Sequence, residues 1–208
     1  MGDYRLPPRL TLIVGMTGSG KSTFAYSYLQ KAEDAVCRFL FDDFGRAATR
    51  LNMTPCYTAR QAEDALQTRW VITNPHRMFP GQVKIAFDWW CQWVYDASLR
   101  GPGRKLALVD EAWQFQTNQQ IPYGLAKIAQ AGREENIELV LCSQLPHRFN
   151  ASLIGQATEL VCFHLKERLA LDCVSNLGAD PDIVRNLPLG KFVSYNLLNG
   201  ASVTGQVF

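Results

Sequence analysis

The chain has 208 residues, which is long enough for one well-buried α/β domain and rather short for two. Hydrophobic residues make up 47% of it and charged residues 19%, which is ordinary for a globular protein and argues against disorder. The formal net charge of +2 neither requires nor excludes a nucleic-acid partner, because a few basic side chains can be concentrated in one place. No apolar run approaches the ~18 residues of a membrane span, so we expect no stable membrane insertion.

The first predicted element is an apolar strand over residues 10–14, after an extended lead-in over residues 1–9 that lacks signal-peptide organisation. A loop with the Walker A pattern G-x-x-x-x-G-K-[ST] follows, and then a helix to about Lys31. Glycines let backbone N–H groups point inward, and the positive end of the helix faces the same place. We expect Lys21 to reach the β- and γ-phosphates of a nucleotide and Ser22 to ligate Mg²⁺. The residues of this expected phosphate loop are Gly15, Met16, Thr17, Gly18, Ser19, Gly20, Lys21, Ser22 and Thr23.

The next stretch alternates strand and helix patterns. The predicted elements are a strand over 35–41, a loop to 57, a helix over 58–67 with Thr58 as its N-cap, a strand over 69–73 and a turn at 74–75. A long helix over 82–100 carries an apolar stripe of Ala86, Phe87, Trp90, Trp93, Val94 and Ala97. Such a stripe is usually core or subunit interface, and we prefer that interpretation to a base-stacking platform. Trp89 falls off the stripe and is predicted to lie at the surface.

An almost wholly apolar strand over residues 105–109 ends at two carboxylates, Asp110 and Glu111. Such a strand is typical of a parallel sheet covered on both faces, and its end places the carboxylates at the edge that holds the phosphate loop. Asp110 is expected to hold Mg²⁺ through its water shell, and Glu111 to accept a proton from a water that attacks the γ-phosphate. The Asp-Glu pair favours a hydrolase over a kinase.

The rest of the chain continues the alternation. The predicted elements are a helix over 118–134, a strand over 137–142, a loop over 146–156, a strand over 159–165, helices over 167–177 and 180–187, and a hairpin of strands 191–197 and 202–207 turning at Asn199 and Gly200. We therefore expect one α/β domain over residues 1–208, with a mostly parallel sheet flanked by helices and a C-terminal β-hairpin. The six cysteines form no C-x-x-C pair, so buried free thiols are favoured over disulfides or zinc.

Two polar residues in this second half are candidates for catalysis. Gln144 ends a strand and could sense the γ-phosphate or orient the attacking water, although it could also be a plain strand-end residue. Arg133 lies at a helix end and could be an arginine finger that reaches a neighbouring subunit's nucleotide. Spacing alone favours the simpler reading of Arg133, in which it interacts with the helix dipole.

Residues 128–146 resemble a stretch of the FtsK/HerA superfamily of DNA-pumping ATPases that reads approximately (L/I)-A-x-x-(A/G)-R-x-x-G-I-x-L-x-L-A-(T/S)-Q-x-P. The matching residues are Ile128, Ala129, Gly132, Arg133, Ile137, Leu139, Leu141, Ser143, Gln144 and Pro146. With the phosphate loop and the two carboxylates, the resemblance covers most of residues 10–165, and more loosely 178 and 187–190. Two residues depart from the pattern: Cys142 replaces Ala, and Asn136 replaces Gly but also tolerates a left-handed turn.

The resemblance implies a P-loop NTPase of the RecA/FtsK/HerA kind, with ATP and Mg²⁺ as cofactors, Arg133 as a finger acting in trans and Gln144 as a polar sensor. Within the superfamily, a single-domain chain of this length resembles the genome-packaging ATPases of tailless icosahedral viruses, especially those with an internal membrane. It implies a DNA-stimulated motor that forms a homo-oligomeric ring (pentamer or hexamer) and pumps double-stranded DNA into a procapsid. The implied partners are capsid vertex proteins, and the implied location is the host cytoplasm or the packaging vertex of the virion.

Basic residues that could line a DNA channel, each also readable as a solvated surface charge, are Arg77, Lys84, Arg104, Lys105 and Arg148. Residues 148–150 form the preferred DNA-contacting loop, since a ring motor grips phosphates without reading bases. Two alternatives stay open. Asp42 and Asp43 after the second strand could position the acceptor hydroxyl of a small-molecule kinase. The chain could also be a nucleotide-gated scaffold for virion assembly or filament export, driven by binding and not by turnover.

Overall fold

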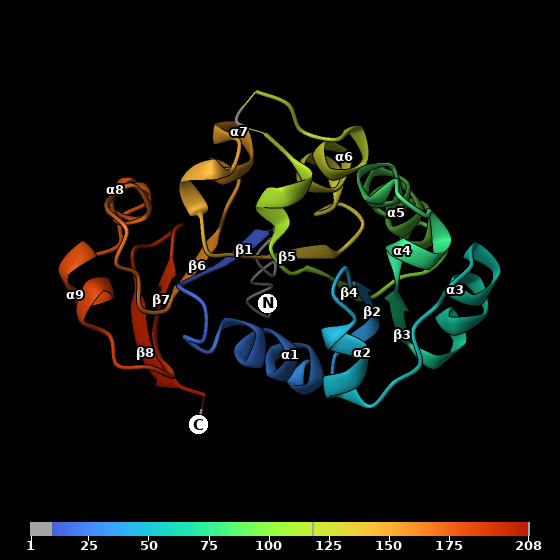
Figure 1. The fold of residues 1–208 in the computed structure, drawn as a ribbon, viewed down its shortest axis with the longest axis horizontal. Helices are drawn as coiled ribbons and strands as arrows, with labels where there is room; N and C mark the ends of the chain where they lie inside the picture. Colours follow the sequence, from blue (N-terminus) through green and yellow to red (C-terminus); the bar gives the residue numbers. More distant parts are fainter. Residues whose placement is uncertain (1–9, 118, 208) are drawn as a thin grey trace, which may run out of the picture.

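The computed structural model describes residues 10–117 and 119–207, and the lead-in expected over residues 1–9 lies outside them. The described strands form one eight-stranded sheet with the order β3-β2-β4-β5-β1-β6-β7-β8 (Figure 1). The strands are β1 (Leu10–Val14), β2 (Ala35–Phe41), β3 (Trp70–Thr73), β4 (Arg104–Val109), β5 (Ile137–Ser143), β6 (Glu159–Cys162), β7 (Lys191–Asn196) and β8 (Ser202–Gln206). Neighbours from β3 to β6 run parallel, and β7 is antiparallel to β6 and β8. The predicted mostly parallel sheet with a C-terminal hairpin is confirmed.

Helices cover both faces of this sheet. Figure 1 shows α1 and α2 on one face and α5 and α6 on the other, with α8 and α9 beside the hairpin. The helices are α1 (Lys21–Lys31), α2 (Arg46–Leu51), α3 (Ala59–Ala65), α4 (Pro75–Met78), α5 (Val83–Ser98), α6 (Tyr123–Ala131), α7 (Ala151–Ile154), α8 (Arg168–Asn176) and α9 (Pro181–Asn186). Short 3₁₀ turns are η1 (Leu66–Thr68), η2 (Ala112–Phe115) and η3 (Pro146–Arg148). No helix among the described residues is both long and apolar enough to cross a bilayer.

The core consists of two apolar clusters, one on each face of the sheet. Successive side chains of a strand point to opposite faces, so a strand buried on both sides must be apolar throughout. On β4, Ala107 and Val109 join the cluster that contains the stripe of α5, whereas Leu106 and Leu108 join the cluster that contains α1. Strands β1 and β5 are buried along their whole length. The central strands are therefore held rigidly, and their carboxyl ends form a fixed platform.

The predicted stripe of α5 is in the core as expected, with Trp90 fully buried. Trp89, predicted to lie at the surface, is partly exposed and packs against the same cluster, as does Trp93 of the stripe. Its ring centroid lies 5.5 Å from that of Phe79 and 6.0 Å from that of Trp93. Phe79 comes from the end of α4, a short helix that replaces the predicted turn at 74–75, with Asn74 as its N-cap. Helix α4 therefore covers the ring of Trp89, which the packing of the α5 stripe alone would leave exposed.

Other element boundaries differ from the prediction. Residues 46–51 form α2 inside a segment predicted as a loop, and η3 and α7 form inside the loop predicted over 146–156. Helix α6 begins at Tyr123, later than predicted, because Pro122 disfavours helical geometry at the residue before it. Residue 118, where that helix was predicted to begin, lies outside the described residues. The six cysteines are free thiols within the described residues, and all but Cys173 are buried.

Two of the basic residues proposed for a DNA channel have structural roles instead. Arg104 lies at the amino end of β4, where its guanidinium donates to Glu138 Oε2 at 2.6 Å, Asp34 Oδ1 at 2.9 Å and the Tyr28 hydroxyl at 2.8 Å. Lys105 is buried, and its ammonium donates to the carbonyl oxygens of Gly101 and Glu135. Neither side chain is a solvated surface charge, and both lie at the edge of the sheet away from the phosphate loop.

Replacing Arg104 by Ala is expected to lower the free energy of unfolding by about 3 kcal/mol, because it leaves the Glu138 carboxylate buried without its cation. The matched control is Arg100→Ala, which removes an ion pair with Glu63 whose two side chains are about half exposed. Such a surface pair contributes less than about 1 kcal/mol. Urea unfolding at neutral pH measures both losses. Equal losses in the two variants would show that the Arg104 cluster does not stabilise the fold.

Candidate nucleotide site

Three segments far apart in the sequence meet at the carboxyl edge of the sheet. Strand β5 pairs with β4 on one side and with β1 on the other, all in parallel. The phosphate loop follows β1, Asp110 and Glu111 follow β4, and Gln144 follows β5. In the register of the sheet, Val14 lies opposite Ser143, so the loop starts beside Gln144. The strand order thus places the predicted site residues around one point.

The phosphate loop has the backbone that its glycines were expected to allow. Gly18 and Gly20 have φ angles of 76° and 110°, in the left-handed region. A Cβ atom on Gly15 would lie 2.6 Å from the Cβ of Phe163 and 2.7 Å from Ser19 Oγ, so no side chain fits there. The Ser19 hydroxyl is buried and has no hydrogen-bond partner among the described residues. Lys21 is 5% exposed, and its Nζ donates to the Met16 carbonyl at 3.2 Å. The loop is a tight cradle with unused donors, which suits phosphate.

The two predicted magnesium ligands are in direct contact. Ser22 Oγ donates to Asp110 Oδ2 at 2.9 Å, which joins the start of α1 to the end of β4. Burial raises the pKa of Asp110, and the hydrogen bond from Ser22 opposes that rise. A hydroxyl and a carboxylate are oxygen ligands of the kind that Mg²⁺ binds beside nucleotide phosphates. Ser22 and Asp110 therefore fit a Mg²⁺ site.

Glu111 is buried, and its carboxylate is held by several N–H donors. Its Oε1 accepts from Gln144 Nε2 at 2.7 Å, and its Oε2 accepts from Trp113 Nε1 at 2.8 Å and from the Gln144 backbone N–H at 3.3 Å. Lys21 Nζ lies 3.9 Å from Oε1. Gln144 in turn accepts from Thr17 Oγ1 at 2.6 Å. Gln144 thus bridges the phosphate loop and Glu111.

Arg133 is not part of this cluster. It lies exposed in the turn between α6 and β5, where its carbonyl oxygen accepts from the Asn136 N–H at 3.1 Å, and its side chain makes no hydrogen bond or ion pair with the described part of the chain. The turn sits at the amino end of β5, whereas the phosphate loop sits at the carboxyl end of the parallel strand β1. A strand of this length separates the two edges by roughly 20 Å, beyond the reach of an arginine side chain. Asn136, in the same turn, has φ 55°, the left-handed geometry that its replacement of Gly requires.

Three residues near the site were missed from the sequence. The indole of Trp113 contacts Glu111, as described above. Arg50 Nη1, from the unpredicted helix α2, donates to Thr23 Oγ1 of the phosphate loop at 2.9 Å. Gly190, before the C-terminal hairpin, donates its N–H to the Ser19 carbonyl at 3.1 Å. No motif marks Trp113 or Arg50, and Gly190 falls only in the loosely resembling segment 187–190, without a predicted role.

The carboxylates that would support a kinase have other partners. Asp42 is 4% exposed, and its Oδ1 and Oδ2 accept the backbone N–H groups of Ala47 and Ala48 at 3.1 and 2.9 Å, at the start of α2. Asp43 Oδ1 lies 2.8 Å from Nε2 of His76. Asp42 therefore caps a helix, and neither oxygen is directed at an acceptor hydroxyl.

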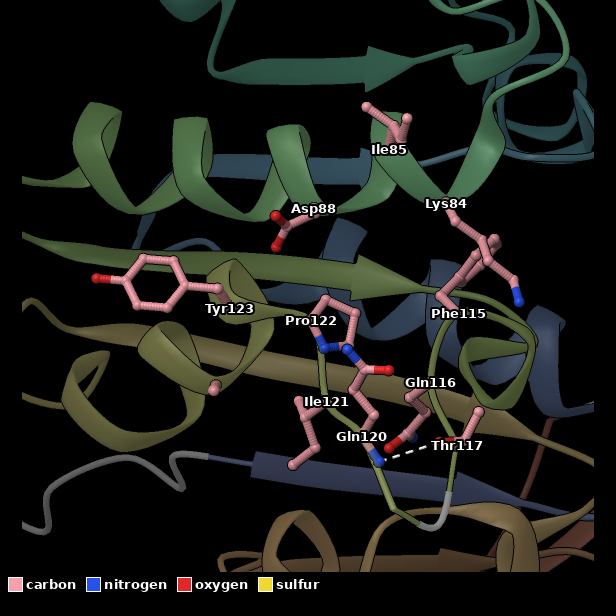
Figure 2. A pocket seen from close by; sticks show the side chains of 11 residues that line it. Lys84, Ile85, Asp88, Phe115, Gln116, Thr117, Gln120, Ile121, Pro122 and Tyr123 are labelled. Carbon is pink, nitrogen blue, oxygen red and sulfur yellow. Dashed lines mark hydrogen bonds between the residues drawn. The ribbon is translucent and has the colours of Figure 1, made fainter.

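The remaining basic candidates lie at the same edge as the site. Arg77 is in α4, with its guanidinium 4.5 Å from the centroid of the Tyr57 ring, and Arg148 is in η3, 5.0 Å from that of Trp113. Lys84, at the start of α5, lines an open pocket of about 660 Å³ (Figure 2). The pocket lies between α5 and the segment from Phe115 to Ala126, apart from the phosphate loop. Arg148 is thus linked to Glu111 through Trp113.

Neither a protein-family model nor a curated protein sequence matches the chain. Among solved structures, the DNA-packaging ATPase B204 of Sulfolobus turreted icosahedral virus is similar, with a TM-score of 0.74 and 18% identity over 95% of this chain and 96% of that one. The genome-packaging NTPase B204 of Sulfolobus turreted icosahedral virus 2, in complex with AMPPCP, gives 0.72 and 17% over 95% and 96%. VirB4 of Thermoanaerobacter pseudethanolicus gives 0.69 and 13% over 95% and 89%. These similar structures are FtsK/HerA-type P-loop ATPases, and the P-loop NTPase fold predicted for this chain is confirmed.

Proposed function

We propose that the chain is an ATP-hydrolysing motor that moves double-stranded DNA, acting as a genome-packaging ATPase. The observation that carries the proposal is the joined set of Ser22, Asp110, Glu111 and Gln144 around the phosphate loop. This set contains the groups that hydrolysis needs, whereas Asp42, the carboxylate that could position an acceptor hydroxyl, caps helix α2. The similar B204 proteins are described as packaging enzymes, one as a DNA-packaging ATPase and one as a genome-packaging NTPase, which supports the choice of DNA as cargo.

Each residue of the site has a separate role in the proposed hydrolysis. The N–H groups of the phosphate loop and Lys21 hold the phosphates, and Ser22 and Asp110 would hold Mg²⁺, which supplies positive charge to the β- and γ-phosphates. Gln144 orients a water whose oxygen forms a bond to the γ-phosphorus while the bond to the bridging oxygen breaks. Glu111 takes the proton of that water, and ADP and inorganic phosphate leave. Because Asp110 and Glu111 are adjacent, one strand end positions both the metal and the base.

A second copy of the chain would complete the site. Arg133 lies at the edge away from its own phosphate loop, so it can act on a nucleotide only in another subunit. A head-to-tail ring, pentameric or hexameric, brings this edge of one subunit to the pocket of the next. We propose that residues 148–150 grip the DNA backbone, that the ring docks on capsid vertex proteins, and that it works in the host cytoplasm or at the packaging vertex of the virion.

The test is ATP turnover per subunit as a function of protein concentration, with and without long duplex DNA. We expect a low rate for dilute protein, a rise as subunits assemble, and a further rise of about tenfold or more with DNA. A rate that is independent of both concentration and DNA would contradict the motor. Turnover that strictly requires a small acceptor molecule would instead indicate a kinase.

A further inference from the structure

Three of the accepting positions of the Glu111 carboxylate are occupied by N–H donors. A carboxylate offers about four lone-pair sites. Three of them are taken by N–H groups, those of Gln144 Nε2, the Gln144 backbone and Trp113 Nε1, at 2.7, 3.3 and 2.8 Å. The remaining site, on Oε1, faces the Lys21 ammonium at 3.9 Å. In this arrangement three N–H donors restrain the proposed base and lower its capacity to accept a proton, and only the position beside Lys21 is left for a water.

Trp113 is the donor with a route to the surface. Glu111 has φ 50°, a left-handed backbone that turns the chain into η2 and brings the indole of residue 113 back onto the carboxylate. The ring of Trp113 also faces the guanidinium of Arg148, whose Cζ lies 5.0 Å from the ring centroid. Arg148 comes from η3, after β5, and is exposed, whereas Phe149 beside it is buried and anchors the turn. The indole therefore lies between the base and an exposed cation on a separate element.

We propose that Trp113 is a positioning residue that restrains Glu111, and that a polyanion, here duplex DNA, loosens the restraint through Arg148. The inference rests on the proposed function and assigns it a means of regulation. A phosphate that pairs with the guanidinium of Arg148 competes with the aromatic face of Trp113, because the charge–charge contact is the stronger one. Once the guanidinium leaves, the indole can turn away, and Glu111 gains a second free lone pair and becomes a stronger base toward the attacking water.

The test compares steady-state kinetics of the wild type, Trp113→Phe and Arg148→Gln, each with and without duplex DNA. Trp113→Phe keeps an aromatic face but removes the N–H, so we expect the DNA-free kcat to rise about five- to tenfold, with KM for ATP unchanged. Arg148→Gln should raise the DNA-free kcat less and should lose most of the stimulation by DNA. The matched controls are Trp89→Phe, a partly buried Trp on α5, and Lys127→Gln, which removes a cation 4.1 Å from the Tyr95 ring. Both should match the wild type.

Three outcomes would contradict parts of this proposal. The proposed restraint is overturned if the DNA-free kcat of Trp113→Phe equals or falls below that of the wild type. The thermal unfolding midpoint of this variant must match that of the Trp89→Phe control, so that a folding defect is not the cause. Full stimulation by DNA in Arg148→Gln overturns the link to the polyanion. A wild type that hydrolyses ATP but is not stimulated by DNA contradicts the proposed motor and the link. The restraint is still judged from the DNA-free rate of Trp113→Phe.

Discussion

Replacing Glu111 by Gln is expected to lower the rate of ATP hydrolysis by about 10² to 10⁴-fold, the range that a positioned general base contributes. The reason is that an amide cannot take the proton of the attacking water. The side chain keeps its size, and the Ser22–Asp110 contact and the phosphate loop are untouched. Affinity for ATP should therefore stay within a few-fold of the wild type. Single-turnover hydrolysis and equilibrium binding of a fluorescent nucleotide measure the two quantities separately.

The matched control for this variant is Glu33→Gln, which makes the same chemical change at an exposed residue at the opposite edge of the sheet. It should hydrolyse ATP at the wild-type rate. Glu111→Gln protein that binds ATP and still turns it over at full speed would remove Glu111 as the base. If instead it lost nucleotide binding as well, the defect would lie in the pocket and not in the proton transfer.

The parts of the fold that could be predicted are those in which burial or backbone geometry alone dictates the residue types in the sequence. Strands β1, β4 and β5 are mostly apolar because helices cover both of their faces, and that burial makes them recognisable in the sequence. The phosphate loop needs glycine at fixed positions, and the carboxylates after β4 must stand at a strand end. Local rules therefore sufficed to place Ser22 beside Asp110 and Gln144 on the strand next to it.

The features that were missed depend on side-chain contacts that no sequence pattern marks. Helix α2 has only six residues and is too short to be stable alone, so it depends on the buried carboxylate of Asp42 at its start. The sequence predicts an ordinary surface cation at Arg104, and only the pairing of β4 with β5 brings Glu138 beside it. Nothing in the sequence distinguishes Trp113 from the other aromatic residues. The left-handed backbone at Glu111 directs its indole toward the Glu111 carboxylate. In each case tertiary contact decides the role.

Arg133, the proposed arginine finger, leads to an expected loss of similar size. Arg133→Ala should lower kcat by about 10³-fold or more, because a guanidinium on the transferring phosphoryl group stabilises its transition-state charge. Affinity for ATP should be unchanged, since Arg133 lies away from the pocket of its own subunit. Arg185→Ala is the matched control, an exposed arginine with a single helical ion pair on α9, and should keep the wild-type rate.

Mixing two inactive variants shows whether Arg133 acts between subunits. Lys21→Ala subunits lack a working pocket but keep Arg133, whereas Arg133→Ala subunits keep the pocket. In a head-to-tail ring assembled from equal amounts, about a quarter of the interfaces pair an intact pocket with an intact arginine, so roughly a quarter of the wild-type rate should return. An arginine that acted only within its own subunit could not restore activity in any mixture. Because each variant alone is inactive, the regained rate is a direct count of pockets completed by a neighbouring copy.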